Sequence, residues 1–169
     1  MTLSMYQASV PVLVRGLTNL KTILGKAQAH AAEKQIDQAA FVSARLFPDM
    51  LPLNRQVHIA TDTAKGCVAR LAGVDAPKFE DVEVTFDELC ERLDKTIAYL
   101  KEFTPAQVDG SEERNIVLKM RSGPIEFTGS SYLLYFVMPN FYFHVTTAYD
   151  ILRHNGVDIG KLDYLGKSN

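Results

Sequence analysis

Hydrophobic residues recur at helical spacing along most of the chain, and this periodicity predicts a protein built mainly from α-helices. A first helix is expected from about Ser4 into the low thirties, because one of its faces is a continuous apolar stripe. Pro11 is expected to kink this helix or to mark off a short first segment, since proline lacks an amide hydrogen. The stripe contains Leu13, Leu17, Leu20 and Leu24.

The second long helix is predicted from residues that favour helix ends. A short helical piece is expected first, at residues 37–44. The segment Phe47–Gly73 then carries an apolar stripe, with Asp49 as the expected N-cap and Pro52 tolerated in the first turn. Gly73 is expected to end this helix, because glycine readily adopts the left-handed conformation that follows a helix.

The third long helix is predicted most clearly, at residues 84–103. Thr85 and Glu88 form a capping box, in which each side chain accepts a hydrogen bond from the other residue's backbone amide. A nearly heptad apolar seam follows. Glu88 and Arg92 are expected to pair on the exposed face, because they are four residues apart.

The pattern changes at residues 115–129, where apolar and polar positions alternate around turn-forming residues, which predicts a small β-hairpin. The last long helix is expected from about Ser130 to Asn155, with Gly156 as its stop. Pro139 should bend it. These elements predict an all-α protein, a single four-helix bundle over residues 1–169 with one hairpin before the last helix, because each apolar stripe needs another helix to cover it.

Composition and charge exclude several classes of function. Hydrophobic residues make up 47% of the chain and charged residues 22%, which is typical of a folded globular protein. The net charge is -2 and the basic residues are scattered, so neither nucleic acid nor a membrane is expected as a partner. Cys67 and Cys90 are expected to be reduced thiols. Since no signal peptide is recognised, we expect a cytoplasmic protein.

Candidate chemistry rests on individual histidines, because the sequence contains no phosphate-binding loop, zinc-protease motif or nucleophile elbow. His58 and Asp62 are four residues apart on the second long helix and therefore share a face. His144 lies within an apolar stretch of the last helix and is expected to be at least partly buried. If the two helices face each other, the three side chains offer two imidazoles and one carboxylate, which suits zinc, iron or nickel.

A simpler interpretation of the same residues stays open. His144 can be a core histidine that is hydrogen-bonded to Tyr142, to Tyr149 or to a backbone carbonyl group. His58 and Asp62 can form a surface pair that contributes only about a few tenths of a kcal/mol.

Three stretches of the sequence resemble a known superfamily: "FPDMLPLNRQV", "ATDTAKG" and "FYFHVTTAYDILRHNGVDIGKLDYLG". With the expected helices and hairpin, they make nearly the whole chain similar to the DinB/YfiT-like superfamily. The chain resembles most closely an uncharacterised domain-of-unknown-function family of bacteria and fungi within that superfamily. The resemblance implies a DinB-like four-helix bundle with a mirror variant of up-and-down topology, often assembled as a homodimer.

The resemblance also implies a site. Better-known members of the superfamily are metal-dependent, and some are thiol-dependent transferases or isomerases. Their metal is held by one histidine of the second helix and by a His-x-x-x-His pair of the last. His58 matches the second-helix ligand and His144 the first histidine of the pair, whereas Ala148 stands where the second is expected. One of the three ligands is therefore missing.

Three functions stay open at this point. We favour a small-molecule-binding protein with a cavity between the second and last long helices near His144, lined also by Tyr142 and Tyr149, and with no resident metal. The first alternative is a metal-dependent enzyme, of the thiol-dependent transferase or hydrolase type, that uses His58, Asp62 and His144 with zinc, nickel or iron. The second alternative is a non-catalytic structural protein that acts as a homodimer.

Overall fold

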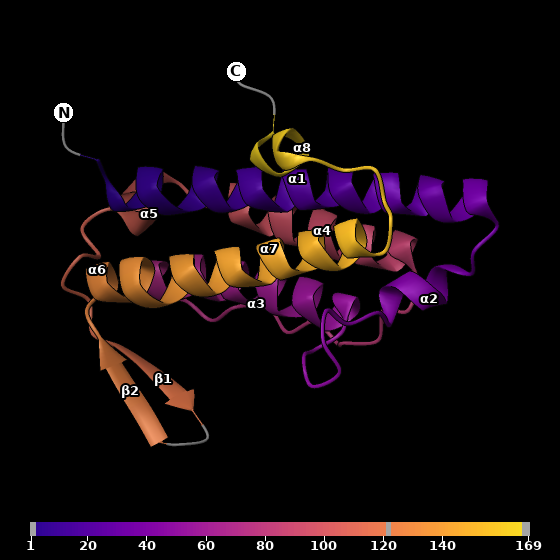
Figure 1. Cartoon of the computed structure of the whole chain (residues 1–169). Coiled ribbons are helices and arrows are strands. Elements are labelled where there is room, and N and C mark those ends of the chain that lie inside the picture. Colours follow the sequence, from indigo (N-terminus) through magenta and orange to yellow (C-terminus); the bar gives the residue numbers. More distant parts are fainter. Residues whose placement is uncertain (1–2, 121–122, 167–169) are drawn as a thin grey trace.

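The computed structural model describes residues 3–120 and 123–166. Its helices lie side by side in an elongated bundle, and a two-stranded hairpin projects from one end (Figure 1). The long helices are α1 (Met5–Lys34), α3 (Leu53–Ala72), α4 (Phe86–Lys101) and α7 (Met138–His154). The shorter elements are α2 (Gln38–Val42), α5 (Pro105–Val108), β1 (Ile116–Met120), β2 (Gly123–Phe127), α6 (Gly129–Ser131), the π-helical segment η1 (Tyr132–Val137) and α8 (Lys161–Leu165).

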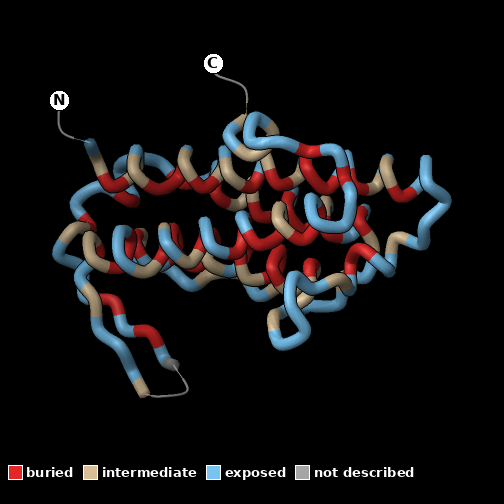
Figure 2. The backbone as a smooth tube through the Cα atoms, in the orientation of Figure 1, coloured by how far each residue is buried: buried red, intermediate tan, exposed pale blue. Residues whose placement is uncertain are grey.

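Each long helix buries one face against its neighbours. Helix α3 packs along α4 and α7, and α1 packs along α4, α3 and α7. The buried positions of these helices point toward the centre of the bundle (Figure 2). Gly16 lets α1 and α7 approach closely, because a Cβ atom there would lie 2.6 Å from a ring carbon of Phe141. The predicted four-helix bundle, with its hairpin before the last helix, is confirmed.

The second long helix begins later than its sequence predicts. Asp49 is the wrong N-cap: α3 begins at Leu53, and Pro52 holds the N-cap position in an extended conformation with ψ 169°. Proline disfavours the helical conformation in the residue before it, so Leu51 cannot continue a helix that starts at Asp49. The amide of Leu53 instead donates to the carbonyl oxygen of Ala44 at 2.9 Å.

The two internal prolines act differently. Helix α1 runs through Pro11 without interruption, so the prediction of a separate first segment is wrong. Before Pro139 the chain is π-helical, and the amide of Met138 donates to the carbonyl oxygen of Leu133, five residues earlier. Pro139 has no amide hydrogen to donate to Tyr135, which fits a wider turn at this place.

Two features of the fold depart from the expectations. Arg92 is not paired with Glu88 on the exposed face of α4, because it is buried, with 2% of its surface exposed. The Glu88 carboxylate instead accepts hydrogen bonds from the amides of Val84 and Thr85 in the capping box. Helix α8, which was not expected, lies against α1.

Cys67 and Cys90 are both free thiols. Burial raises the pKa of Cys67 to about 12, so this thiol stays protonated at neutral pH. Within residues 3–120 and 123–166, no helix combines the length and the apolar character that a bilayer crossing needs.

Candidate functional site

Helix α3 meets α7 through a polar seam. Nδ1 of His144 lies 2.7 Å from Oε1 of Gln56, and both side chains are buried. The amide nitrogen of Gln56 donates to the carbonyl oxygen of Leu51 at 2.8 Å, which orients the amide group. Nδ1 of His144 is therefore the donor, and Nε2 carries the lone pair. Farther along, Asn140 donates to the Thr63 hydroxyl at 2.8 Å, so the α3–α7 seam is bridged twice.

Burial determines the charge of His144. The residue is 8% exposed, and loss of hydration lowers the pKa of its imidazole below the usual 6.5. The ring is therefore neutral at physiological pH. The interpretation as a core histidine is correct, but Tyr142 and Tyr149 are the wrong partners, because the hydrogen bond reaches Gln56 on α3.

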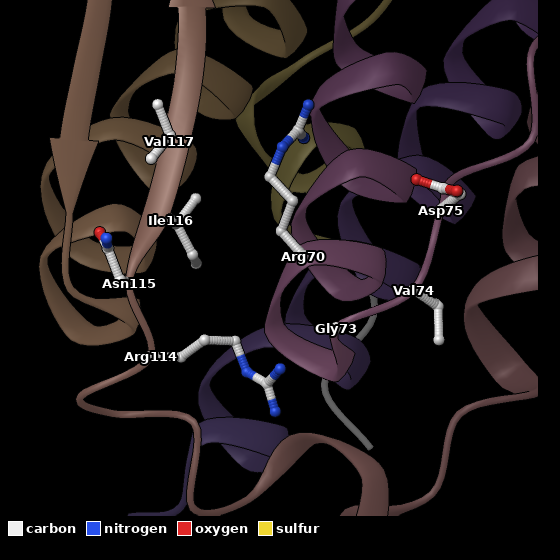
Figure 3. Close-up of a pocket in the computed structure, with 8 residues that line it drawn as sticks. All are labelled: Arg70, Gly73, Val74, Asp75, Arg114, Asn115, Ile116 and Val117. Atoms are coloured by element: carbon white, nitrogen blue, oxygen red, sulfur yellow. The ribbon is translucent and has the colours of Figure 1, made fainter.

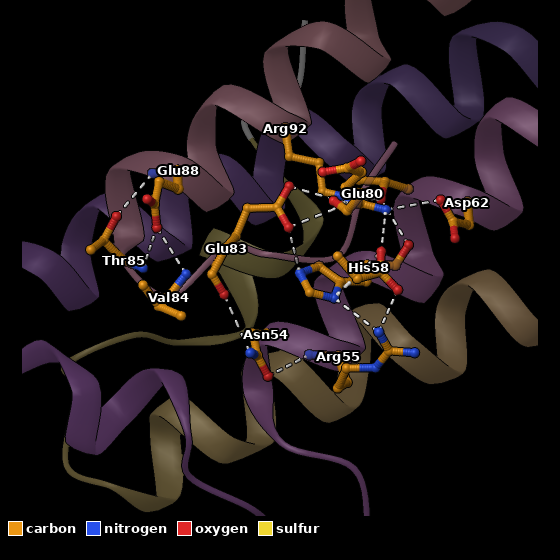
Figure 4. A network of polar contacts seen from close by, with 12 residues as sticks. Asn54, Arg55, His58, Asp62, Glu80, Glu83, Val84, Thr85, Glu88 and Arg92 are labelled. Atoms are coloured by element: carbon orange, nitrogen blue, oxygen red, sulfur yellow. Dashed lines mark hydrogen bonds and ion pairs between the residues drawn. The ribbon is translucent and has the colours of Figure 1, made fainter. Parts of the chain in front are cut away.

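On the side of α3 that faces α4, His58 lies among charged groups (Figure 4). Its Nε2 lies 2.9 Å from Oε2 of Glu83, although it is not aligned for a full hydrogen bond, and its Nδ1 lies 3.7 Å from Oδ1 of Asp81. Nδ1 also lies 3.4 Å from Nη1 of Arg55. Burial, followed by the positive charge of Arg92, lowers the pKa of His58, whereas the two carboxylates oppose this shift.

Arg92 of α4 is the centre of this group. Its Nη2 lies 2.9 Å from Oδ1 of Asp62 and 3.0 Å from Oδ1 of Asp81, and its Nη1 lies 3.1 Å from Oε1 of Glu83. Its Nε donates to the Thr61 hydroxyl at 2.8 Å. A guanidinium group can be buried here because each of its nitrogens has a partner. We call the following residues the charged cluster: Arg55, His58, Asp62, Asp81, Glu83 and Arg92.

The three residues considered for a metal have separate partners. The Asp62 carboxylate binds Arg92 and also Nζ of Lys65, at 2.6 Å, and not His58. His58 lies in the charged cluster, whereas His144 lies in the α3–α7 seam. Throughout residues 3–120 and 123–166, no three histidine, cysteine, aspartate or glutamate side chains are grouped so that they could hold a metal ion. The donor set therefore does not fit the metal that the resemblance implies.

The α3 residue that faces His144 is Gln56, not His58. Each residue of an α-helix is rotated by about 100° from the one before it. Gln56 and His58 are two positions apart and therefore differ by about 200°, which places them on opposite sides of α3. His58 is thus turned away from the seam in which the matching ligand would be needed. Ala148, one turn after His144, is fully buried and offers no donor atom from its side chain.

A different hollow lies between α7 and α8. It has a volume of about 220 Å³. Of His144, Tyr142 and Tyr149, which the sequence predicts to line a cavity, Tyr149 lines this hollow. The rings of Tyr149 and Tyr164 meet edge to face, with centroids 6.0 Å apart. Tyr142 is 41% exposed, and His144 faces α3 instead. We call this the tyrosine hollow; its lining residues are Thr146, Tyr149, Asp150, Lys161 and Tyr164.

Sequence reasoning missed the residues that organise both sides of α3. Gln56 gives no sequence signal of its role, and Asp81 and Glu83 lie in a connecting segment without a motif. Arg92 could have been found, since it follows Leu89 of the apolar seam by three residues and therefore lies beside that seam.

Comparison with known proteins places the chain in a family. A family model described as "Domain of unknown function (DUF1993)" matches residues 5–165. The chain belongs to the DUF1993 family. Among solved structures, it is similar to a DinB family member protein from Shewanella denitrificans, with 41% sequence identity and a TM-score of 0.89 over 96% of this chain and 92% of that chain. A search of curated proteins finds no match.

These comparisons confirm the predicted resemblance and the DinB-like fold of this DUF1993 chain. They name no ligand, metal or reaction for it. Its chemistry must therefore be inferred from its own side chains.

Proposed function

We propose that this DUF1993 protein binds a small planar molecule that carries an amine, and that the tyrosine hollow is the binding site. The observation that carries the proposal is the combination of two tyrosine rings with a carboxylate in one hollow. Asp150 is only partly exposed and forms no hydrogen bond or ion pair within residues 3–120 and 123–166. Its carboxylate is therefore available to a cationic ligand.

The aromatic rings suit the same ligand. A cation close to the face of a tyrosine ring is attracted by the ring's quadrupole, with a contribution of about 0.5–2 kcal/mol. Tyr149 and Tyr164 also offer apolar surface to a flat ring system. Lys161, an exposed residue of the same lining, would repel a second positive charge, which favours a ligand with a single amine.

Helix α8 is held in a fixed position, which reduces the entropy lost when a ligand binds. Lys26 of α1 forms an ion pair with Asp163 at 2.6 Å, and Asn19 donates to the carbonyl oxygen of Tyr164 at 3.0 Å. The Tyr164 hydroxyl shares a hydrogen bond of 2.9 Å with Thr146 of α7. The two walls of the hollow are thus tied to each other and to α1.

A titration followed by NMR tests the proposal, with tyramine as the amine and 4-ethylphenol as its uncharged counterpart. We expect tyramine to bind more tightly than 4-ethylphenol and to shift signals of Tyr149 and Tyr164. Asp150→Asn should weaken tyramine binding roughly tenfold, since a hydrogen bond to a charged group contributes about 1.5–3 kcal/mol. Asp158→Asn, at an exposed position that is not part of the lining, is the matched control. Equal binding of both compounds, or no effect of Asp150→Asn, would contradict the proposal.

The predicted homodimer stays a prediction, and one observation favours it. Three large apolar side chains are exposed: Leu134 by 54%, Tyr135 by 78% and Phe143 by 55%. Exposed apolar side chains of this size commonly gather at protein interfaces. Light scattering of the purified chain should give twice the monomer mass, and Tyr135→Ser should reduce it. A monomeric mass at high micromolar concentration would count against a dimer.

A further inference from the structure

A second hollow lies between strand β1 of the hairpin and the C-terminal end of α3 (Figure 3). It has a volume of about 430 Å³, and the neighbouring residues Ile116 and Val117 of β1 both line it. Successive side chains of a strand point to opposite faces of a sheet, so a hollow that both of them line must face the edge of the strand. Since β2 pairs with β1 along its other edge, this is the outer edge of the hairpin.

The outer edge of β1 carries unused backbone groups. In residues 3–120 and 123–166 the sheet consists of β1 and β2, and no backbone hydrogen bond joins β1 to any segment other than β2. Alternate amide and carbonyl groups along this edge are therefore free to pair with another extended chain. The five residues of β1 offer about 13 Å of such an edge.

Two arginines lie at opposite ends of the hollow (Figure 3). The guanidinium group of Arg70 lies beside Gly66, where a Cβ atom would be 3.5 Å from its central carbon. That of Arg114 lies beside Gly73, where a Cβ atom would be 3.2 Å from its central carbon. The two glycines are seven residues apart along α3, or about 10 Å along the helix axis. One small anion cannot contact both groups, whereas an extended chain of about three or four residues spans this distance.

Neither arginine is neutralised by a carboxylate in the part of the chain that the structure describes. Arg70 donates to the hydroxyl of Tyr132 at 3.0 Å, and burial raises the pKa of Tyr132 to about 12, so the phenol is uncharged at neutral pH. Asp75 also lines the hollow, but it lies across α3 from β1 (Figure 3). The two positive charges therefore favour a partner with acidic side chains.

We propose that the outer edge of β1 is a docking site for an extended acidic segment of a partner protein, which adds a third strand to the hairpin along the hollow. Backbone hydrogen bonds to the strand edge supply affinity, and two acidic side chains three or four residues apart reach the two arginines. Val117 and Val74, which are 47% and 51% exposed, offer apolar contacts to the residues between them.

A second copy of this chain is a poorer partner for the same edge. Pairing two β1 strands would bring the exposed basic residues Arg114 and Lys119 of both copies close together, and like charges on adjacent strands are destabilising. The docking site is separate from the tyrosine hollow and does not depend on the function proposed for it.

Titrations of the whole chain with short peptides, followed by NMR, test the docking site. The probe is the terminally blocked peptide TDVTVDT, whose aspartates are four residues apart, and TNVTVNT is its uncharged counterpart. We expect saturable binding of TDVTVDT and slower hydrogen exchange of β1 amides in the complex. The uncharged peptide should bind at least roughly threefold more weakly, because its contacts with the arginines are not charge-assisted. Absence of saturable binding of TDVTVDT would overturn the proposal.

N-methylation of the peptide backbone separates strand pairing from simple attraction between charges. One form of TDVTVDT carries N-methyl groups on both valines, and a second form carries one on the central threonine. Because amides alternate between the two edges of a strand and only one edge can pair with β1, one form should lose binding and the other should keep it. Equal binding of the two forms would show that the peptide does not add as a strand.

Variants of the protein test the two arginines. Arg70→Gln and Arg114→Gln should each weaken the binding of TDVTVDT at least roughly threefold, since each removes a charge-assisted contact. Arg114→Gln is the decisive variant, because Arg70→Gln also breaks the contact with Tyr132.

Lys34→Gln is the matched control. Lys34 is an exposed residue at the end of α1, at the end of the bundle opposite the hairpin (Figure 1). Its removal should change the affinity by less than about twofold, since salt screens a charge so far from the hollow. Equal losses in Lys34→Gln and Arg114→Gln would show that the peptide responds only to net charge. Protection of the outer β1 amides in the free protein would assign this edge to another copy of the chain and would also contradict the proposal.

Discussion

Helix α3 has a different polar contact on each of two sides. On the side toward α7, the Gln56 amide is hydrogen-bonded to the neutral imidazole of His144, and on the side toward α4 lies the charged cluster. In the α3–α7 seam, Nδ1 of His144 lies 2.7 Å from Oε1 of Gln56, and both groups are neutral at physiological pH. In the charged cluster, a buried arginine is surrounded by Asp62, Asp81 and Glu83. The same helix therefore contributes to two kinds of buried polar contact. The neutral imidazole is paired with one amide, whereas the buried guanidinium group needs several partners.

The difference determines how each side responds when one residue is removed. A neutral hydrogen bond leaves one unsatisfied group behind, at a cost of about 1–3 kcal/mol. A buried ion pair leaves an uncompensated charge, which costs about 3–5 kcal/mol. We therefore expect the α4 side to be the more fragile side of α3.

The largest effect is expected from Arg92→Met, which keeps the volume but removes the charge. Glu83 then loses its buried counter-ion, whereas Asp81 keeps its ion pair with Arg55, so the free energy of unfolding should fall by about 3 kcal/mol, the lower end of that range. Urea denaturation measures the change. Lys95→Met, on the exposed face of the same helix with a weak 3.9 Å contact to Glu91, should cost less than about 0.5 kcal/mol. If Arg92→Met and Lys95→Met lower the free energy of unfolding by similar amounts, the charged cluster is not the fragile side of α3 and the account is contradicted.

A smaller effect is expected in the α3–α7 seam. His144→Leu should destabilise the protein by about 1–3 kcal/mol, because Gln56 Oε1 is left buried without a donor. Gln56→Leu should have a similar effect. The double variant should be more stable than the sum of the two losses predicts, since neither polar partner remains. Strictly additive losses in urea denaturation would show that the two side chains are not coupled.

The smallest effect concerns pH. Burial lowers the pKa of His144 below 6.5, so the unfolded chain takes up the proton first as the pH falls. The stability contributed by the neutral ring is complete above the unfolded pKa and is lost as the pH falls through the folded pKa. The difference in unfolding free energy between the wild type and His144→Leu should therefore be smaller at pH 5 than at pH 8. A constant or larger difference at pH 5 would contradict this account.

Most of the fold follows from local patterns in the sequence. The apolar stripes, the capping box of Thr85 and Glu88, and the stop at Gly73 predicted α1, α3, α4 and the hairpin. The start of α3 was misplaced because the effect of Pro52 on Leu51 outweighs the preference of Asp49 for a cap. Helix α8 was not predicted because its five residues are too few to show a periodic hydrophobic pattern in the sequence. The helix is held by contacts with α1, which is distant in the sequence.

The site was less predictable, because it depends on which side chains meet across helices. The burial of His144 followed from its apolar surroundings, but its partner Gln56 is 88 residues away in sequence. His58 and Asp62 do share a face of α3, yet each is bound by Arg92 or by carboxylates of the following segment. Spacing along one helix indicates direction, and only the packed structure identifies the partner.

The central claim is that His58 and His144 belong to two separate environments and not to one metal site. The most direct test records the imidazole ¹⁵N signals of untagged protein at pH 7.5, before and after one equivalent of zinc chloride. We expect His144 to be neutral with its proton on Nδ1, and the signals of both histidines to be unchanged by zinc. A stoichiometric shift of His58 and His144 together on addition of zinc would contradict the account.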